Sequence, residues 1–240
     1  MFSALFKRDL SGFFYSNSAY FVFAAYALIS MLMCIFKGEY FFIGDDSLRS
    51  FFVFQPQIMA LIIPIITMRG WAEEYRSSTV EVLMSFPVST LKMVLSKFFS
   101  AWCAALIMSL AVIPLIITQA LYIDSDWGSI FCSFIGFVLG CAVLCAAGTL
   151  ASALTAVPAV AYVAGLTFSF VIINFNANAI IPRLSDNLPF FFERVFDFSA
   201  WYQNFLNGQV NPAGVFYFVA LTALLLFFNW LIIFNRRERQ

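Results

Sequence analysis

The chain has 240 residues, of which 62% are hydrophobic and 11% charged, and its formal net charge is zero. A soluble domain usually carries about 45–50% apolar and about 25% charged residues, so this composition excludes a water-soluble fold. The neutral balance also leaves no basic face for a nucleic acid. With a mean hydropathy of +0.90, the sequence predicts an all-α polytopic membrane protein built as one domain, residues 1–240.

The N-terminal segment, residues 1–18, predicts a short helix that lies in the membrane interface. Phe2, Leu5 and Phe6 share this segment with Lys7 and Arg8. Apolar residues at helical spacing beside charged ones are typical of a helix that rests on the bilayer surface. The alternative is a polar extension of the first membrane span.

Six apolar stretches are each long enough to cross a hydrocarbon core of about 30 Å, which takes about 20 residues. They cover residues 19–36, 51–68, 98–123, 129–154, 157–181 and 213–234, and none contains Asp, Glu, Lys or Arg. The break between the fourth and fifth stretches is uncharged, but Pro158 suits the first turn of a new helix. We therefore predict two spans there. A single kinked helix is the alternative, and it would invert the membrane orientation of every later segment.

The positive charges favour a cytoplasmic location for both chain ends. With the N-terminus inside, nine lysines and arginines lie on the cytoplasmic side and four lie outside. This is the bias that the positive-inside rule describes. An even number of spans then places Arg236, Arg237 and Arg239 inside as well.

The connection at residues 69–97 is predicted to hold a short cytoplasmic helix between the second and third spans. Ser78 and Glu81 have the spacing of a capping box, which begins a helix. Pro87 ends that helix, and Ser89 can cap the next one. A helix bounded in this way can carry force into both spans. The alternative is an ordinary interfacial loop whose charges are solvated.

Polar and small residues inside the spans indicate a pathway or helix packing. The strongest polar groups near membrane depth are Gln55, Gln57, Gln119, Asn174, Asn176 and Asn178. Polar side chains in a bilayer face protein or water, so these are candidates for a pathway lining, with interhelical hydrogen bonding as the alternative. Gly136, Gly140 and Gly148 are expected to let another helix approach closely. Pro64 and Pro114 are expected to kink the second and third spans.

The spans offer little for chemistry inside the membrane. All five cysteines lie in apolar stretches without a CxxC pair, and the chain has no histidine. We interpret the cysteines as small core residues and predict no metal site. Without His or acids in the spans, an intramembrane hydrolase and an ion-coupled carrier are both disfavoured.

The connection at residues 182–212 is long and aromatic. Phenylalanines alternate there with Glu193, Arg194 and Asp197. This pattern predicts a short helix that re-enters or lies on the outer leaflet, and Trp201 and Tyr202 suit the headgroup level. A surface helix without any gating role is the alternative.

Residues 73–89, which read EEYRSSTVEVLMSFPVS, resemble the run between spans two and three of type-two ABC exporter permeases. The resemblance is greatest to the six-span branch that includes gliding-motility-associated permeases and those serving nitrous-oxide-reductase maturation. In that family this segment is a coupling helix that docks on an ATPase. The resemblance therefore assigns ATPase coupling to Glu73, Glu74, Arg76, Thr79, Glu81, Leu83 and Pro87.

The resemblance extends to residues 198–210, where the gliding-motility branch has a similar aromatic-x-x-Phe-x-x-Gly pattern. Trp201 and Tyr202 replace the His-Phe pair of that pattern. In the family, paired external helices close the pathway on the outside. The resemblance thus implies an external gate at Phe198, Trp201, Tyr202, Phe205 and Gly208.

Together these features predict the permease subunit of an ABC exporter in a bacterial inner membrane. No GxxxxGK[ST] loop is present to cradle phosphates, so ATP and Mg²⁺ are expected in a partner ATPase, with no catalytic residue and no cofactor in this chain. The expected partners are a cytoplasmic ABC ATPase subunit, a second permease copy or a paralogous or auxiliary membrane subunit, and the lipid bilayer. The alternative is a non-transporting anchor or assembly subunit that does mechanical work on an outer partner.

Overall fold

The structure is a computed structural model, and it describes residues 2–37, 49–80, 88–114, 117, 127–174 and 197–238. Within these ranges all regular structure is helical. Several of the helices are long and apolar enough to cross a membrane. The prediction of an all-α polytopic membrane protein is confirmed.

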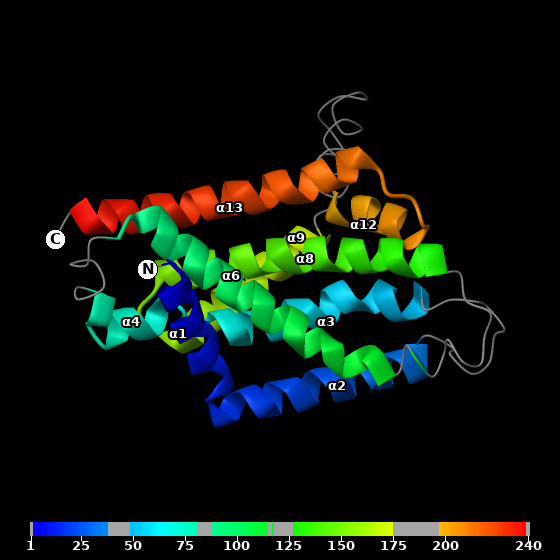
Figure 1. The fold of residues 1–240 in the computed structure, drawn as a ribbon, viewed down its shortest axis with the longest axis horizontal. Coiled ribbons are helices and arrows are strands. Elements are labelled where there is room, and N and C mark those ends of the chain that lie inside the picture. The colour runs from blue at the N-terminus through cyan, green and yellow to red at the C-terminus, as the bar shows by residue number, and fades with distance from the viewer. Residues whose placement is uncertain are drawn as a thin grey trace, which may run out of the picture.

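Long helices run side by side along the molecule (Figure 1). They are α2 (Asn17–Lys37), α3 (Arg49–Thr67), α6 (Thr90–Ser109), α8 (Trp127–Leu154), α9 (Pro158–Asn174) and α13 (Pro212–Glu238). Shorter helices are α1 (Phe2–Phe14), α4 (Ala72–Arg76) and α12 (Phe198–Leu206). α1, α4 and both chain ends gather toward one end, named here the α4 end, whereas α12 lies toward the other, named here the α12 end (Figure 1).

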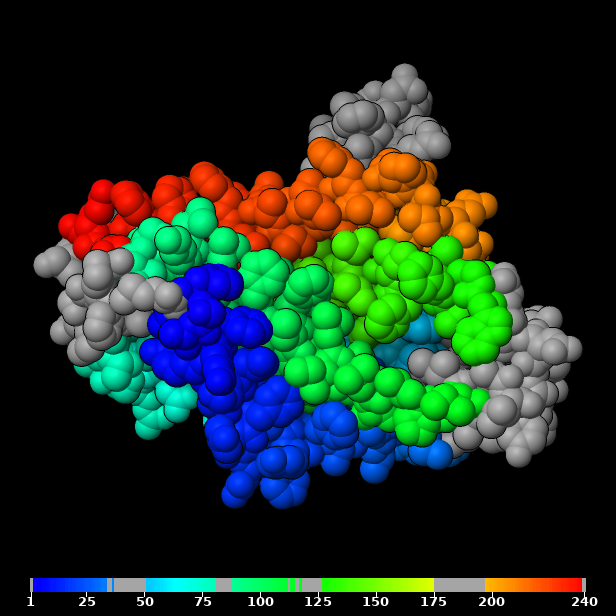
Figure 2. Space-filling view, viewed as in Figure 1, coloured from blue at the N-terminus to red at the C-terminus, as the bar shows by residue number. Residues whose placement is uncertain are grey.

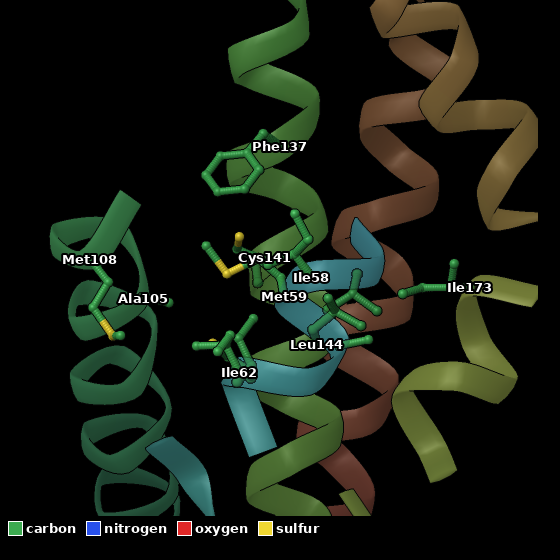
Figure 3. Packing of buried hydrophobic residues seen from close by; sticks show 14 of the residues in the cluster. Ile58, Met59, Ile62, Ala105, Met108, Phe137, Cys141, Leu144 and Ile173 are labelled. Carbon is green, nitrogen blue, oxygen red and sulfur yellow. The ribbon is translucent and has the colours of Figure 1, made fainter. Parts of the chain in front are cut away.

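The core lies between α3 and α8, with α6 and α9 on either side (Figure 3). Its labelled members are Ile58, Met59 and Ile62 of α3, Phe137, Cys141 and Leu144 of α8, Ala105 and Met108 of α6, and Ile173 of α9. α8 is apolar on every side, as expected of a helix surrounded by other helices. α2 and α13 instead expose large apolar side chains such as Phe21 and Phe216, which suits contact with lipid tails.

Four helical stretches in the described ranges are long and apolar enough to cross a membrane: Phe51–Arg76, Thr90–Ser109, Trp127–Leu154 and Pro212–Glu238. The pair formed by α1 and α2, bent by 72° at its break, raises the number to five when it counts as one span. α9 is apolar but has 17 residues, and the rest of the predicted fifth span lies outside the described residues. Six spans therefore stay a prediction.

α1 is a separate helix and not a straight extension of α2, from which it is bent by 72°. It crosses the surface of α6 (Figure 2), where Phe2 meets Phe99 edge to face with 6.3 Å between ring centroids. The amphipathic pattern read from the sequence therefore forms a helix that packs on protein along one side.

The helix type changes from α to 3₁₀ at the end of α6, close to the position where the sequence predicts a kink. The α-helix ends at Ser109 and a 3₁₀ turn follows at Leu110–Val112. Pro114 cannot bond to the carbonyl of Leu110, and its ring clashes with that carbonyl, so a tighter turn forms there. Pro64, by contrast, lies inside α3, which is continuous from Arg49 to Thr67.

α8 and α9 are two helices that pack against each other, as predicted in preference to one kinked helix. α9 begins at Pro158, where the missing N–H is harmless. A Cβ added to Gly165 of α9 would lie 3.6 Å from the Cβ of Ala151 and 3.7 Å from the Cα of Gly148 in α8. Gly165 and its neighbours in α8 lie at similar distances along the chain from the break between α8 and α9. The chain therefore reverses direction at this break.

Candidate functional site

The turn between α3 and α4 is fixed by one hydroxyl group of α8. Ser152 is fully buried, and its Oγ accepts hydrogen bonds from the backbone N–H groups of Trp71 (3.0 Å) and Ala72 (3.1 Å). The same Oγ donates to the carbonyl of Met68 at 3.1 Å. Ser152 thus satisfies backbone groups at the beginning of α4 that have no partner within the helix. The turn cannot move away from α8 without leaving these groups unpaired.

A network of four charged side chains connects α1, α4 and α6. Oε1 of Glu74 contacts Nη2 of Arg8 at 2.7 Å and Nζ of Lys97 at 2.9 Å. Asp9 accepts from Nη2 of Arg8 at 2.8 Å, and its other carboxylate oxygen lies 3.8 Å from Nζ of Lys97. Two cations and two acids therefore neutralise one another, and we name this set the charge network.

Lys97 is the most deeply placed member of the charge network, with 5% of its side chain exposed. Its Nζ donates to the carbonyl of Gly70 at 2.6 Å and lies 4.8 Å from the ring centroid of Trp71. A buried ammonium group needs such partners because desolvation is costly. Lys97 thereby ties α6 to the same turn that Ser152 ties to α8.

Arg8 lies on the outer side of the charge network and is about half exposed. Burial lowers the pKa of Arg8, but the nearby carboxylates of Asp9 and Glu74 raise it by more, so the pKa lies above its usual value. The guanidinium therefore stays charged at any physiological pH.

The end of α13 contacts the other side of this region. The Arg236 guanidinium lies 4.4 Å from the ring centroid of Tyr75, within the range of a cation–π interaction. Arg237 donates to the carbonyl of Val88 at 2.9 Å. Beneath these arginines, Ile233 is buried in a small apolar cluster with Trp71. Segment 69–80 is therefore held by α1, α6, α8 and α13 together.

The predicted coupling residues occupy different environments within this region. Glu73, Arg76 and Thr79 are exposed, whereas Glu74 is largely enclosed in the charge network. Glu81, Leu83 and Pro87 lie outside the described residues. The structure thus offers Glu73 and Arg76 at the surface for a partner and commits Glu74 to contacts within the chain.

The two helix caps predicted here differ from expectation. Ser78 has a φ of 56°, the left-handed conformation that follows a helix end, whereas an N-cap residue is usually extended. It separates α4 from a helical segment that begins at Thr79, so a helix does start directly after Ser78, as predicted. The predicted partner Glu81 lies outside the described residues. Ser89 does occupy the N-cap position of α6 with an extended backbone, but its side chain makes no capping hydrogen bond.

A cavity of about 470 Å³ opens beside the charge network. Arg8, Asp9, Glu74 and Lys97 line it, together with apolar residues of α2, α3 and α6 such as Val22, Ile65 and Ala101. The cavity is polar where the charge network borders it and apolar toward the helix bundle. These four charged side chains are already paired with one another, and Arg69 and Glu73 also line the cavity.

The three predicted pathway residues that the structure describes lie in different environments. Gln55 is fully buried and accepts a hydrogen bond from the Tyr26 hydroxyl at 2.9 Å, which joins α3 to α2. Gln57 is exposed, and so is Asn174, whose Nδ2 donates to the carbonyl of Phe170 at 3.0 Å. Gln119, Asn176 and Asn178 lie outside the described residues. Gln55 thus makes the interhelical hydrogen bond that was the alternative interpretation.

At the α12 end, the predicted gate residues form an aromatic contact with α8. A Cβ on Gly136 would lie 2.7 Å from the Cβ of Phe205, and one on Gly140 would lie 3.4 Å from Phe198. Phe198 and Phe205 are fully buried. The two glycines therefore hold α12 close to α8, and Gly136 cannot accept a side chain without movement of a helix.

The remaining gate residues, and Asp197 directly before the helix, fix the position of α12. Asp197 caps the helix by accepting from the N–H of Ala200 at 3.1 Å, and the Tyr202 hydroxyl donates to the carbonyl of Phe52 at 2.8 Å. Trp201 stacks on Tyr217 of α13 at 6.1 Å between ring centroids. After the helix, Gly208 adopts a φ of 74°, a conformation that favours glycine.

Gly148, the third predicted packing glycine, faces a different neighbour. A Cβ added there would clash with Oγ1 of Thr67 in α3. Gly136 and Gly140 contact α12, whereas Gly148 lies against α3 and close to Gly165 of α9. The prediction of close packing agrees with this geometry.

Sequence reasoning missed several residues of these sites. Ser152, Asp9 and the pairing of Lys97 give no local signal, because their partners lie far away in the chain. Asn229 was visible as a polar residue in the sixth predicted span. It is fully buried, and within the described residues neither atom of its amide group has a hydrogen-bond partner.

The described ranges contain no group of three or more His, Cys, Asp or Glu side chains that could hold a metal ion. Cys141 and Cys145 are buried free thiols in the core of α8.

Comparison with known proteins gives one family match. The model of a family described as ABC-2 family transporter protein matches residues 17–238, which is nearly the whole chain. No curated protein matches the sequence. The match is to the family as a whole, so the gliding-motility branch stays a prediction.

Proposed function

Because the chain belongs to the ABC-2 family of transporter proteins, we propose that it is the membrane subunit of an ABC exporter that is driven by a separate ATPase. Family membership supports a multi-pass ABC permease subunit that works with an ABC ATPase subunit. The direction of transport and the coupling to ATP hydrolysis are our inference from the residues at the α4 end.

The observation that carries this proposal is the way segment 69–80 is attached. It is tied to α6 by Lys97, to α8 by Ser152, to α1 by Arg8 and to α13 by Arg236. Glu73 and Arg76 remain exposed on its surface. A partner that pushes on these two residues therefore displaces four helices together.

We propose that the α4 end faces the cytoplasm of a bacterial cell and that the protein lies in its inner membrane. Both chain ends gather toward this end (Figure 1), and the count of lysines and arginines favours a cytoplasmic location for it. ATP hydrolysis in the partner, with its Mg²⁺, then takes place next to α4. A second permease copy or an auxiliary membrane subunit completes the assembly.

Copurification and ATPase measurements test this proposal. The tagged chain should bring down an ABC ATPase and raise its turnover in lipid nanodiscs. Glu73→Arg should lower this stimulation at least fivefold, because it reverses an exposed charge on the proposed docking surface. Lys7→Glu, an exposed reversal on α1, is the matched control and should leave stimulation unchanged.

The outcomes also separate transport from anchoring. A passive anchor would copurify with the ATPase without changing its turnover. Normal stimulation by the Glu73→Arg chain would rule out docking at α4. If the complex has stimulated ATPase activity but moves no substrate across the membrane when it is reconstituted in vesicles, mechanical work on an outer partner would be favoured.

A further inference from the structure

A second pocket, of about 560 Å³, lies on the other side of α4, between α4 and the beginning of α9. Its lining includes Arg69, Glu73 and Arg76 from the segment after α3, and Pro158, Tyr162 and Val163 from α9. The size falls in the usual range for ligand pockets, about 300–1,000 Å³. We name it the α4–α9 pocket.

The charges of the α4–α9 pocket are not balanced. Arg69 and Arg76 are both exposed, and Glu73 is the one acid in the lining. The first cavity differs because its lining holds as many acids as cations, and the carboxylates of Asp9 and Glu74 pair there with Arg8 and Lys97. Arg69 and Glu73 border both cavities, and Arg69 donates a hydrogen bond to the Ser16 hydroxyl at 3.4 Å. The α4–α9 pocket also includes the first turn of the 17-residue helix α9, whose N-terminus adds partial positive charge. An anion is therefore the complementary ligand.

An exposed apolar stripe leads away from this pocket along α9. Val160, Val163 and Val171 are 54%, 58% and 60% exposed, and their spacing places them on one side of the helix. Ala161, Gly165 and Ile173 are buried on the opposite side. Tyr162, half-buried in the pocket, has the amphipathic ring that suits the boundary between headgroups and acyl chains. A ligand with a charged head and an apolar tail fits both parts.

From this arrangement we propose that the α4–α9 pocket binds an anionic phospholipid of the adjacent leaflet. The phosphate lies between Arg69 and Arg76, and an acyl chain lies along the valine stripe of α9. The lipid is a bound component and not the cargo, so this inference does not rest on the proposed transport function. Basic pockets beside membrane helices bind anionic headgroups through the same electrostatics.

The test uses the purified full chain in detergent, titrated with dioctanoyl phosphatidylglycerol and followed by native mass spectrometry. Parallel titrations use dioctanoyl phosphatidylcholine and inorganic phosphate. Each cation near an anionic membrane surface contributes about 1 kcal/mol, so Arg69→Gln with Arg76→Gln should weaken phosphatidylglycerol binding about thirtyfold. Lys7→Gln with Lys92→Gln removes two exposed cations outside the pocket and should change binding less than threefold.

Each other outcome overturns the proposal. Equal weakening in both double variants would mean general charge attraction, and equal affinity for phosphatidylcholine would mean no anion preference. Inorganic phosphate that competes at the same concentration as the lipid would mean an anion site without a role for the tail. Arg76→Glu alone is a second test, since it reverses one exposed charge and should abolish the preference for phosphatidylglycerol.

Discussion

The two ends of the molecule hold their short helices by different forces. At the α4 end, α4 is attached by ion pairs and hydrogen bonds from Arg8, Lys97 and Ser152. At the α12 end, Phe198 and Phe205 pack against glycines of α8. Polar contacts are directional and depend on charge and salt, whereas aromatic packing depends on shape. The attachment at the α4 end should therefore respond to charge and salt, and the attachment at the α12 end to side-chain shape.

The strongest test of this contrast is Lys97→Met. The substitution removes the buried ammonium group of Lys97 and leaves Glu74 without this partner. It should lower the free energy of unfolding by about 3 kcal/mol, as measured by denaturation in mixed micelles. Hydrogen exchange should rise in α4 and stay unchanged in α12. Lys92→Met, an exposed position on the same helix, should change stability by less than about 0.5 kcal/mol. Faster exchange in α12 would show that the two ends are not independent.

Gly136→Ala tests the α12 end. The new Cβ would lie 2.7 Å from the Cβ of Phe205, so α12 must move, at a cost of about 2 kcal/mol. Exchange should then rise in α12 and not in α4. Gly12→Ala is the control, because a Cβ there meets nothing within 4 Å. Equal stability of the two variants would contradict the close contact.

Ser152→Ala sharpens the contrast by removing hydrogen bonds without changing any charge. Two buried backbone N–H groups lose their partner, so stability should fall by about 1–2 kcal/mol. Ser100→Ala is the matched control, since that hydroxyl donates to Lys97 O within its own helix and should cost clearly less. If the two losses were the same, Ser152 would not be a special attachment for α4.

Tyr202→Phe should have the smallest effect. It deletes one hydrogen bond, from the Tyr202 hydroxyl to the carbonyl of Phe52, and keeps the ring packing. The expected loss is about 1 kcal/mol, and it should be the same at 50 mM and 500 mM salt in thermal denaturation. Tyr20→Phe, at an exposed position of α2, is the control. A strong dependence on salt would mean that charge also contributes at the α12 end.

The long helices were predictable from the sequence because a bilayer demands long apolar stretches, and Pro158 marks a helix start by local chemistry. Neither α4 at Ala72–Arg76 nor the cap at Asp197 was predicted. A disturbance of the helix near Pro114 was also predictable, because proline lacks the N–H group that an α-helix needs at that position. The start of α6 at Thr90 agrees with the cap predicted at Ser89, whereas the partners that shield the charge of Lys97 were not predictable.

The candidate site was predictable only in part. The sequence pointed to residues 69–97 and to residues near α12 through patterns along the chain. It assigned Glu74 to a partner protein, whereas that side chain contacts Arg8 and Lys97. Ser152 looked like one small polar residue among many. Contacts between residues distant in sequence leave no local pattern, and these contacts define the α4 end.

The charge network also sets an order of events during synthesis. Arg8 lies on α1, and its partner Glu74 follows 66 positions later, which corresponds to several seconds of translation. Until Glu74 and Lys97 emerge, α1 has no counterpart for its contacts across the chain. The N-terminal helix therefore docks only after the second membrane helix and the beginning of the third have been made.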